Sequence, residues 1–312
     1  MSRTSELAIA ANEPAPNSPR EISFEVFGRS LAALQWGNPA GTPTIALHGW
    51  LDNANTFNRL APRLPELNIV ALDFAGHGRS AHLPPGCHYH GLFDIQDVLA
   101  VADQLGWERF NLIGHSMGAG ISTELAGLFP ERVIKAVMID GFLATGVADP
   151  RERINSNREA LLQMLHKSDR QPPVYGNLDD MVTRVTQATD QSAAAARELV
   201  ERGHKPVAGG YTWRTDPRIR FNTPLRMPTE QIDELMRRTT APGLLIVARQ
   251  GDRWYRSEVE ARKARHPDLT VVEMDGPHHI HLEPDHCETV AGLIRSFLEI
   301  APTTGDQSRF ST

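Results

Sequence analysis

The feature that most restricts the fold of this chain is a series of short, uninterrupted apolar runs, each ending at a glycine or a polar residue. Runs without alternation are typical of strands buried on both faces, as in a parallel sheet. Helical patterns separate the runs, as between the expected N-cap Asp94 and Gly106 and again over residues 284–300. The sequence therefore predicts an α/β fold, a mainly parallel central sheet with helices on both faces. The runs occupy residues 44–47, 69–72, 110–113, 133–139, 244–248 and 270–274.

Residues 22–36 follow a different pattern. Ile22, Phe24 and Val26 alternate with polar residues, and a turn at Gly28 precedes a second apolar stretch. Alternation on both sides of a glycine turn is typical of an antiparallel hairpin. We expect this hairpin at an edge of the sheet.

The alternation of strand and helix stops between residues 142 and 240. Amphipathic stretches joined by loops rich in proline and glycine fill this segment, and we identify no strand run in it. We interpret residues 142–240 as a helical cap inserted into one α/β core, formed by residues 21–141 and 241–300. That leaves a core of about 190 residues, an ordinary size for one domain. Residues 1–20 and 301–312 are expected to be tails, the first of them flexible.

Charge and composition exclude several kinds of partner. Lys and Arg number 32 against 38 Asp and Glu, a net charge of −6, so no positive field attracts nucleic acid. No apolar stretch is long enough for a membrane span. The two cysteines, Cys87 and Cys287, do not form a disulfide framework and fit a reducing compartment. We expect a cytoplasmic monomer or homodimer that binds neither nucleic acid nor membrane.

One motif carries the chemistry. Gly114, His115, Ser116, Met117 and Gly118 follow the apolar run that ends at residue 113 and precede a helical stretch over residues 119–128. G-x-S-x-G between a strand and a helix is the nucleophile elbow, in which the serine occupies a strained bend. The neighbouring backbones approach so closely there that only glycine fits two residues to either side. The motif predicts a nucleophilic Ser116 at the carboxyl edge of the sheet.

With this motif the chain resembles the α/β-hydrolase superfamily, from about residue 22 to the last helix. Within it, His-Gly-Trp-Leu-Asp-Asn-Ala-Asn-Thr-Phe at residues 48–57 and Trp-Arg-Thr-Asp-Pro-Arg at residues 213–218 resemble the serine hydrolase-like branch, which includes the mesoderm-specific-transcript type. The resemblance implies the α/β-hydrolase fold and a Ser, acid, His order along the chain. The blocks that carry it are residues 48–53, 73–80, 114–118, 250–253 and 276–283.

A serine hydroxyl needs a base to accept its proton and a third group to orient that base. The resemblance implies that His278, after the last strand run, is the base, and His279 and His281 compete for this role. It implies Asp252, after the run 244–248, as the acid, with Asp140 as the alternative after the run 133–139. It also implies an oxyanion hole formed by the backbone N–H groups of Trp50 and Met117.

Other polar residues near these motifs have two interpretations. Asp52 and His115 are candidates for the substrate pocket, although Asp-Asn after a strand is also ordinary turn chemistry. Zinc sites use His and Cys at short spacing, but no second ligand pair follows these groups, so we expect no metal and no cofactor. The histidine-rich groups are His278, His279, His281 and His286, and Cys87, His88 and His90.

The function expected from the sequence is hydrolysis of a small or medium carboxylic ester through an acyl-enzyme intermediate, with a small acyl compound as substrate. Amide, thioester or C–C bond hydrolysis on the same triad is the alternative, and a non-catalytic ligand-binding receptor of the same fold is a second one. A serine at residue 116 argues against the dehalogenase and epoxide hydrolase chemistry of related families, which use aspartate at the elbow.

Overall fold

A computed structural model describes residues 18–142, 146–251, 259, 263–266 and 268–300. Its main sheet has eight strands in the order β1-β2-β4-β3-β5-β6-β10-β11. The first two pairings in this order are antiparallel and all the others are parallel, which confirms the predicted α/β class. The strands are β1 (Arg20–Val26), β2 (Arg29–Gly37), β3 (Thr42–Leu47), β4 (Leu67–Leu72), β5 (Phe110–His115), β6 (Val133–Ile139), β10 (Gly243–Ala248) and β11 (Leu269–Met274).

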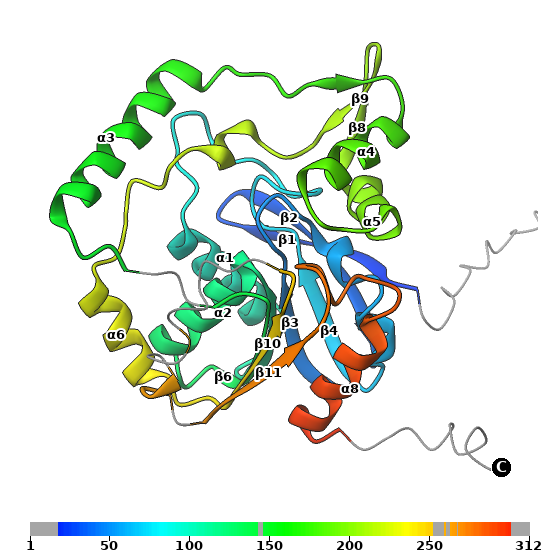
Figure 1. Cartoon of the computed structure of the whole chain (residues 1–312), viewed down its shortest axis with the longest axis vertical. Helices are drawn as coiled ribbons and strands as arrows, with labels where there is room; N and C mark the ends of the chain where they lie inside the picture. Colours follow the sequence, from blue (N-terminus) through cyan, green and yellow to red (C-terminus); the bar gives the residue numbers. More distant parts are fainter. Residues whose placement is uncertain (1–17, 143–145, 252–258, 260–262, 267, 301–312) are drawn as a thin grey trace, which may run out of the picture.

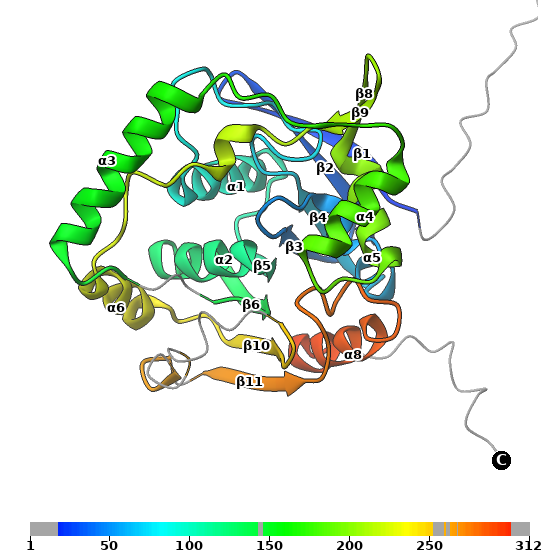
Figure 2. The ribbon, with the colours of Figure 1, turned by 45° about the horizontal axis from the view of Figure 1, so that its top comes forward.

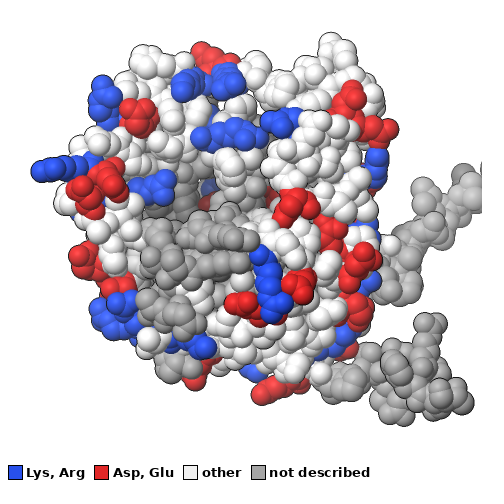
Figure 3. Space-filling model, viewed as in Figure 1, with Lys and Arg blue, Asp and Glu red and all other residues white. Residues whose placement is uncertain are grey.

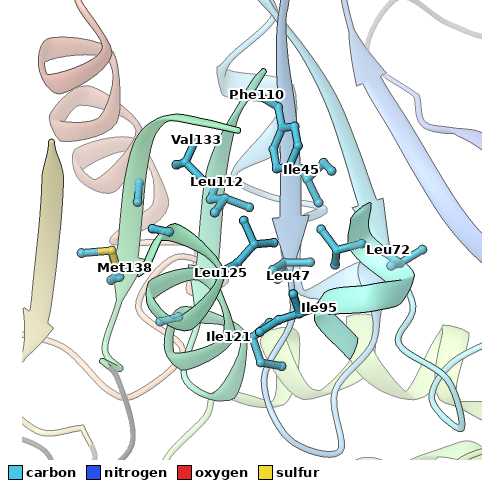
Figure 4. Packing of buried hydrophobic residues seen from close by; sticks show 14 of the residues in the cluster. Ile45, Leu47, Leu72, Ile95, Phe110, Leu112, Ile121, Leu125, Val133 and Met138 are labelled. Carbon is cyan, nitrogen blue, oxygen red and sulfur yellow. The ribbon is translucent and has the colours of Figure 1, made fainter. Parts of the chain in front are cut away.

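Helices cover both faces of this sheet (Figures 1 and 2). Neighbouring residues of one strand pack on opposite faces: Ile45 and Leu47 contact the cluster that contains α1 and α2, whereas Ala46 contacts the cluster that contains α8. Figure 4 shows the first cluster, in which Ile95 of α1 and Leu125 of α2 meet the side chains of the strands. This two-sided burial is the reason why the strand runs do not alternate. The helices are α1 (Gly91–Gln104), α2 (Met117–Leu128) and α8 (Cys287–Leu298).

Two local predictions have different outcomes. The hairpin is confirmed, since β1 pairs antiparallel with β2 at the edge of the sheet and positive φ angles at Phe27 and Gly28 make the turn. The predicted start of α1 is wrong by one turn, because the N-cap is His90. Nδ1 of its ring accepts a hydrogen bond from the backbone N–H of Leu92. Asp94 instead lies in the first helical turn.

The segment between β6 and β10 is mostly helical, but it also contains a second, three-stranded sheet in the order β7-β9-β8. The expectation of no strands there is wrong, because strands of two to four mostly half-buried residues leave no apolar run. The last helix, α6, packs on α2 of the main core through Ile232 and Leu235. The elements of this inserted segment are α3 (Pro150–Lys167), β7 (Val174–Tyr175), α4 (Leu178–Ala188), α5 (Ala193–Gly203), β8 (His204–Val207), β9 (Gly210–Trp213), η3 (Pro217–Arg220) and α6 (Thr229–Arg238).

Buried ion pairs join the inserted segment to the main sheet. Nε of Arg202, at the end of α5, lies 2.8 Å from Oδ2 of Asp73, which follows β4, and neither side chain is exposed to more than 2%. Arg218 of η3 pairs with Asp216, which also accepts a hydrogen bond of 2.8 Å from the hydroxyl of Tyr89. Breaking a buried pair leaves an uncompensated charge, so these contacts fix the segment over the carboxyl ends of the strands. In the part of the chain that the structure describes, no helix is long and apolar enough to cross a membrane.

Candidate active site

Ser116 is the single residue between β5 and α2. Its backbone has φ 50° and ψ −112°, a strained conformation for a residue with a side chain. A Cβ on Gly118 would lie 2.0 Å from the carbonyl oxygen of Leu47, and a Cβ on Gly114 would lie 2.4 Å from that of Gly118. The elbow and the two glycines therefore have the geometry that the motif predicts.

Replacing Gly118 by alanine is expected to lower the free energy of unfolding by about 3 kcal/mol, because the new methyl group overlaps backbone that cannot move away. Urea denaturation measures this loss. Gly292→Ala in α8 is the matched control, since nothing lies within 4 Å of its Cβ position. The free energy of unfolding of this control should rise by about 0.5–1 kcal/mol. Equal losses in both variants would contradict the close approach of Gly118 to the backbone of Leu47.

His278 is hydrogen-bonded to Asp140, a residue that directly follows β6. Nδ1 of His278 lies 2.6 Å from Oδ2 of Asp140, and Oδ1 accepts a hydrogen bond of 2.9 Å from the backbone N–H of Ala248. The Asp140 side chain is fully buried. Asp252, the first choice for the acid from the sequence, lies outside the described residues. Asp190 accepts a hydrogen bond of 3.2 Å from the backbone N–H of His278, whereas the sequence alternative Asp140 is the carboxylate hydrogen-bonded to its imidazole ring.

Ser116 and His278 open into one cavity of about 820 Å³, within the range of small-molecule sites. The loop after β3, including Trp50 and Asp52, forms one wall, and the inserted segment forms the other. Met117 is the first residue of α2, so its backbone N–H has no acceptor within the helix. The structure thus places Ser116, His278 and Trp50 around one space, with Met117 directly after Ser116.

Asp52 and His115, the predicted pocket candidates, form a buried polar cluster with His279 at the floor of the cavity. Oδ2 of Asp52 lies 3.0 Å from Nε2 of His279 and 3.3 Å from Nδ1 of His115, while Nε2 of His115 donates to the carbonyl oxygen of His278. Burial raises the pKa of Asp52, but the charge of His279 and its hydrogen bond to Oδ2 help to hold this pKa well below its usual value. Burial, and then the charge of His279, lowers the pKa of His115 to about 3, so its imidazole is neutral at pH 7.

Among the described residues, Asp52, His115 and His279 form a group whose possible metal-ligand atoms all lie within 4.8 Å of one another. That spacing is close enough for one metal ion to bind all three. His, His and carboxylate form a familiar ligand set for transition metals. Here, however, Oδ2 of Asp52 is already a hydrogen-bond partner of His279, and His115 supports the backbone of His278. We therefore interpret the cluster as a support for the loop that carries His278. His281 lies beside it, with Nε2 3.0 Å from Oγ1 of Thr56.

Acidification from pH 7.5 to 5.5 is expected to reduce the contribution of His115 to the free energy of unfolding. Below pH 6.5 the unfolded chain binds a proton at this histidine, whereas the folded chain, with a pKa of about 3, does not. Stability is therefore lost as the pH falls, by about 1.4 kcal/mol per pH unit below 6.5. Urea denaturation of the wild type and of His115→Gln at both pH values measures the difference.

The comparison between variants is needed because other buried groups titrate in the same range. Burial raises the pKa of Glu124 to about 7, which favours the folded state as the pH falls from 7 towards 4.5 and so opposes the histidine. Glu124 is present in both proteins, and its effect cancels. A pH dependence of equal size in His115→Gln would show that His115 is not held neutral.

The small positive excess in the inserted segment allows a basic lid, but sequence reasoning did not identify the residues that line the cavity, which are Lys167, Arg170, Arg184 and Arg220. They come from separate elements of the inserted segment. The available signal was the composition of residues 151–240, which contain 15 Lys and Arg against 12 Asp and Glu. That small excess did not indicate which cations share a wall.

Comparisons with known proteins agree with this geometry. The sequence model of the alpha/beta hydrolase family matches residues 45–293. The chain is 33% identical to the serine hydrolase-like protein of Danio rerio, over 92% of this chain and 90% of that one. It is 32% identical to serine hydrolase-like protein 2 of Homo sapiens, over 91% and 96%. The crystal structure of the hypothetical protein PA1622 from Pseudomonas aeruginosa PAO1 superposes with a TM-score of 0.84 at 41% identity, over 89% of this chain and 99% of that one.

The family match covers more than half of the chain, and the relatives align over nearly its whole length. The residues matched by the family model include the elbow, the loop after β3 and His278, which border the cavity. The protein is thus a hydrolase of the α/β fold that resembles the serine hydrolase-like branch, and it belongs to the α/β-hydrolase family.

Proposed function

We propose that this hydrolase cleaves a carboxylic ester by a two-step acyl transfer. The observation that carries the proposal is the hydrogen bond of 2.6 Å between Asp140 and His278, beside the cavity into which the strained Ser116 opens. A carboxylate on Nδ1 keeps the proton of a neutral imidazole on that nitrogen and leaves Nε2 as the base. Asp140 is therefore proposed as the orienting acid.

In the first step, Oγ of Ser116 attacks the carbonyl carbon while Nε2 of His278 accepts the hydroxyl proton. The backbone N–H groups of Trp50 and Met117 bind the developing oxyanion, each contributing about 3–4 kcal/mol to stabilisation of the transition state. Collapse of the tetrahedral intermediate expels the alcohol, which takes the proton from His278. In the second step, water gives a proton to His278 and attacks the acyl-serine. Collapse of this second tetrahedral intermediate releases the acid, and His278 returns the proton to Oγ of Ser116.

The substrate is proposed to bind between the main sheet and the inserted segment, which would then act as a cap. A volume of about 820 Å³ suits a small or medium ester. Amide, thioester or C–C bond hydrolysis on the same residues is the alternative.

A panel of 4-nitrophenyl esters of increasing acyl length tests the proposed reaction. We expect saturable release of nitrophenolate with a maximum of kcat/KM at an intermediate length, because longer chains exceed the cavity. Tight binding of these esters without turnover would instead identify a receptor of the same fold.

A further inference from the structure

The wall of the cavity that the inserted segment contributes is strongly basic. Lys167 ends α3, Arg170 follows it, Arg184 lies in α4 and Arg220 ends η3, and all four line the cavity that contains Ser116. Figure 3 shows Lys and Arg on the part of the surface that lies between α3 and α4 in Figure 1. Four cations therefore converge on one space in a protein whose net charge is −6.

These cations have no carboxylate partner among the described residues. Other arginines of the inserted segment do, as in the pair between Arg202 and Asp73 and the pair between Arg218 and Asp216. Among the described residues, the carboxylates that line the cavity are Asp52 and Asp216, and both are already engaged, by His279 and by Arg218. The positive charge of the wall is thus not neutralised by side chains of the described residues.

The cations are near enough to affect one another, and Arg220 packs on a residue of the loop after β3. Burial lowers the pKa of Arg220, and the charges of Arg184 and Arg170 lower it further, as expected for cations that share one wall. The guanidinium carbon of Arg220 lies 5.5 Å from the centre of the Trp50 ring. Trp50 belongs to the loop that contains the proposed oxyanion hole, so a group bound by Arg220 would lie in the same cavity as a carbonyl at Ser116.

We propose that the substrate of this site is an ester or thioester that carries a carboxylate or phosphate group away from its scissile carbonyl, and that Arg220, Arg184 and Arg170 bind this anion. The inference rests on the proposed function, because it places the carbonyl at Ser116. Arginine binds carboxylate and phosphate through two parallel N–H donors, which gives orientation as well as attraction. Unpaired cations in a concave wall also raise the local concentration of anionic substrate.

A matched pair of esters tests the carboxylate form. The 4-nitrophenyl monoester of adipic acid carries a free carboxylate, and the corresponding methyl 4-nitrophenyl diester has the same chain without the charge. We expect the wild type to prefer the anion by at least about tenfold in kcat/KM. Arg220→Gln and Arg184→Gln should each reduce this ratio about tenfold, a loss similar to that of one charge-assisted hydrogen bond.

A matched pair of thioesters tests the phosphate form. Hexanoyl-coenzyme A carries phosphates in its leaving group, whereas hexanoyl-N-acetylcysteamine has the same thioester without them. A larger preference in the adipate pair would place the acyl side of the scissile bond at the basic wall. A larger preference in the thioester pair would place the leaving-group side there. In either pair, 0.5 M NaCl should reduce the preference, because charges at the cavity rim are screened.

Arg158→Gln is the control for both pairs, since Arg158 is an exposed arginine of α3 that does not line the cavity. Its preference ratio should equal that of the wild type. A wild type without preference in either pair, or equal losses in Arg158→Gln and Arg220→Gln, would overturn the proposed anion site.

Calorimetric titration of Ser116→Ala with each member of the pairs separates the two proposals. Tighter binding of the anionic member without turnover in the wild type would support the anion site and contradict the hydrolytic function. Turnover in the wild type with equal binding of both members would support the hydrolytic function and contradict the anion site.

Discussion

Replacing Asp140 by asparagine is expected to lower kcat for 4-nitrophenyl acetate about 10⁴-fold. The carboxylate of Asp140 lies 2.6 Å from Nδ1 of His278 and keeps the imidazole proton on that nitrogen. An asparagine amide can donate to Nδ1 instead, which places the proton on Nε2 and removes the base from Ser116. Asn has nearly the same volume as Asp, so the loss should appear in kcat while the unfolding midpoint changes little.

Asp252→Asn is the matched control, because it makes the same substitution at the other carboxylate that the sequence offers as the acid. We expect it to keep kcat within about tenfold of the wild type, since Asp140 still orients His278. Full loss of turnover in Asp252→Asn with retention in Asp140→Asn would show that Asp252, and not Asp140, is the acid that orients His278.

Replacing Ser116 by alanine is expected to lower kcat about 10⁶-fold, because no other group at the elbow can form the acyl intermediate. Removing a hydroxyl from a strained bend should leave the fold intact, as thermal unfolding can verify. The measurement is nitrophenolate release at saturating 4-nitrophenyl acetate.

Ser122→Ala provides the control for this large effect. Ser122 lies in α2, the helix that follows Ser116, and its hydroxyl donates to the carbonyl oxygen of Gly118 rather than opening into the cavity. We expect this variant to retain turnover within about threefold. Residual activity of Ser116→Ala near that of Ser122→Ala would place the chemistry elsewhere.

The main sheet could be predicted because its strands are buried on both faces. Residues 45–47 and 244–248 are apolar throughout and lie in β3 and β10, whose residues contact core clusters on both sides. The small sheet in the inserted segment could not be predicted in this way. Its strand β8 contains Lys205 and Pro206 and is half-exposed, so its stability depends on pairing with β9 and leaves no apolar signal.

The acid of the site could not be assigned from the sequence for a topological reason. Asp140 follows β6 and Asp252 follows β10, and these strands are parallel neighbours in which Ile139 pairs with Ile246. Residues beyond both strands therefore start from the same edge of the sheet, and spacing along the chain cannot distinguish them. The basic wall presents the same difficulty, since Arg170, Arg184 and Arg220 lie in three different elements that only the tertiary fold brings together.

Labelling with an active-site-directed fluorophosphonate, followed by peptide mapping, tests the central claim most directly. We predict a single phosphonylated residue, Ser116, no labelling of Ser116→Ala, and much slower labelling of Asp140→Asn because its imidazole no longer activates the hydroxyl. Equal labelling of the wild type and Ser116→Ala, or a label on another residue, would contradict the claim that Ser116 is the nucleophile.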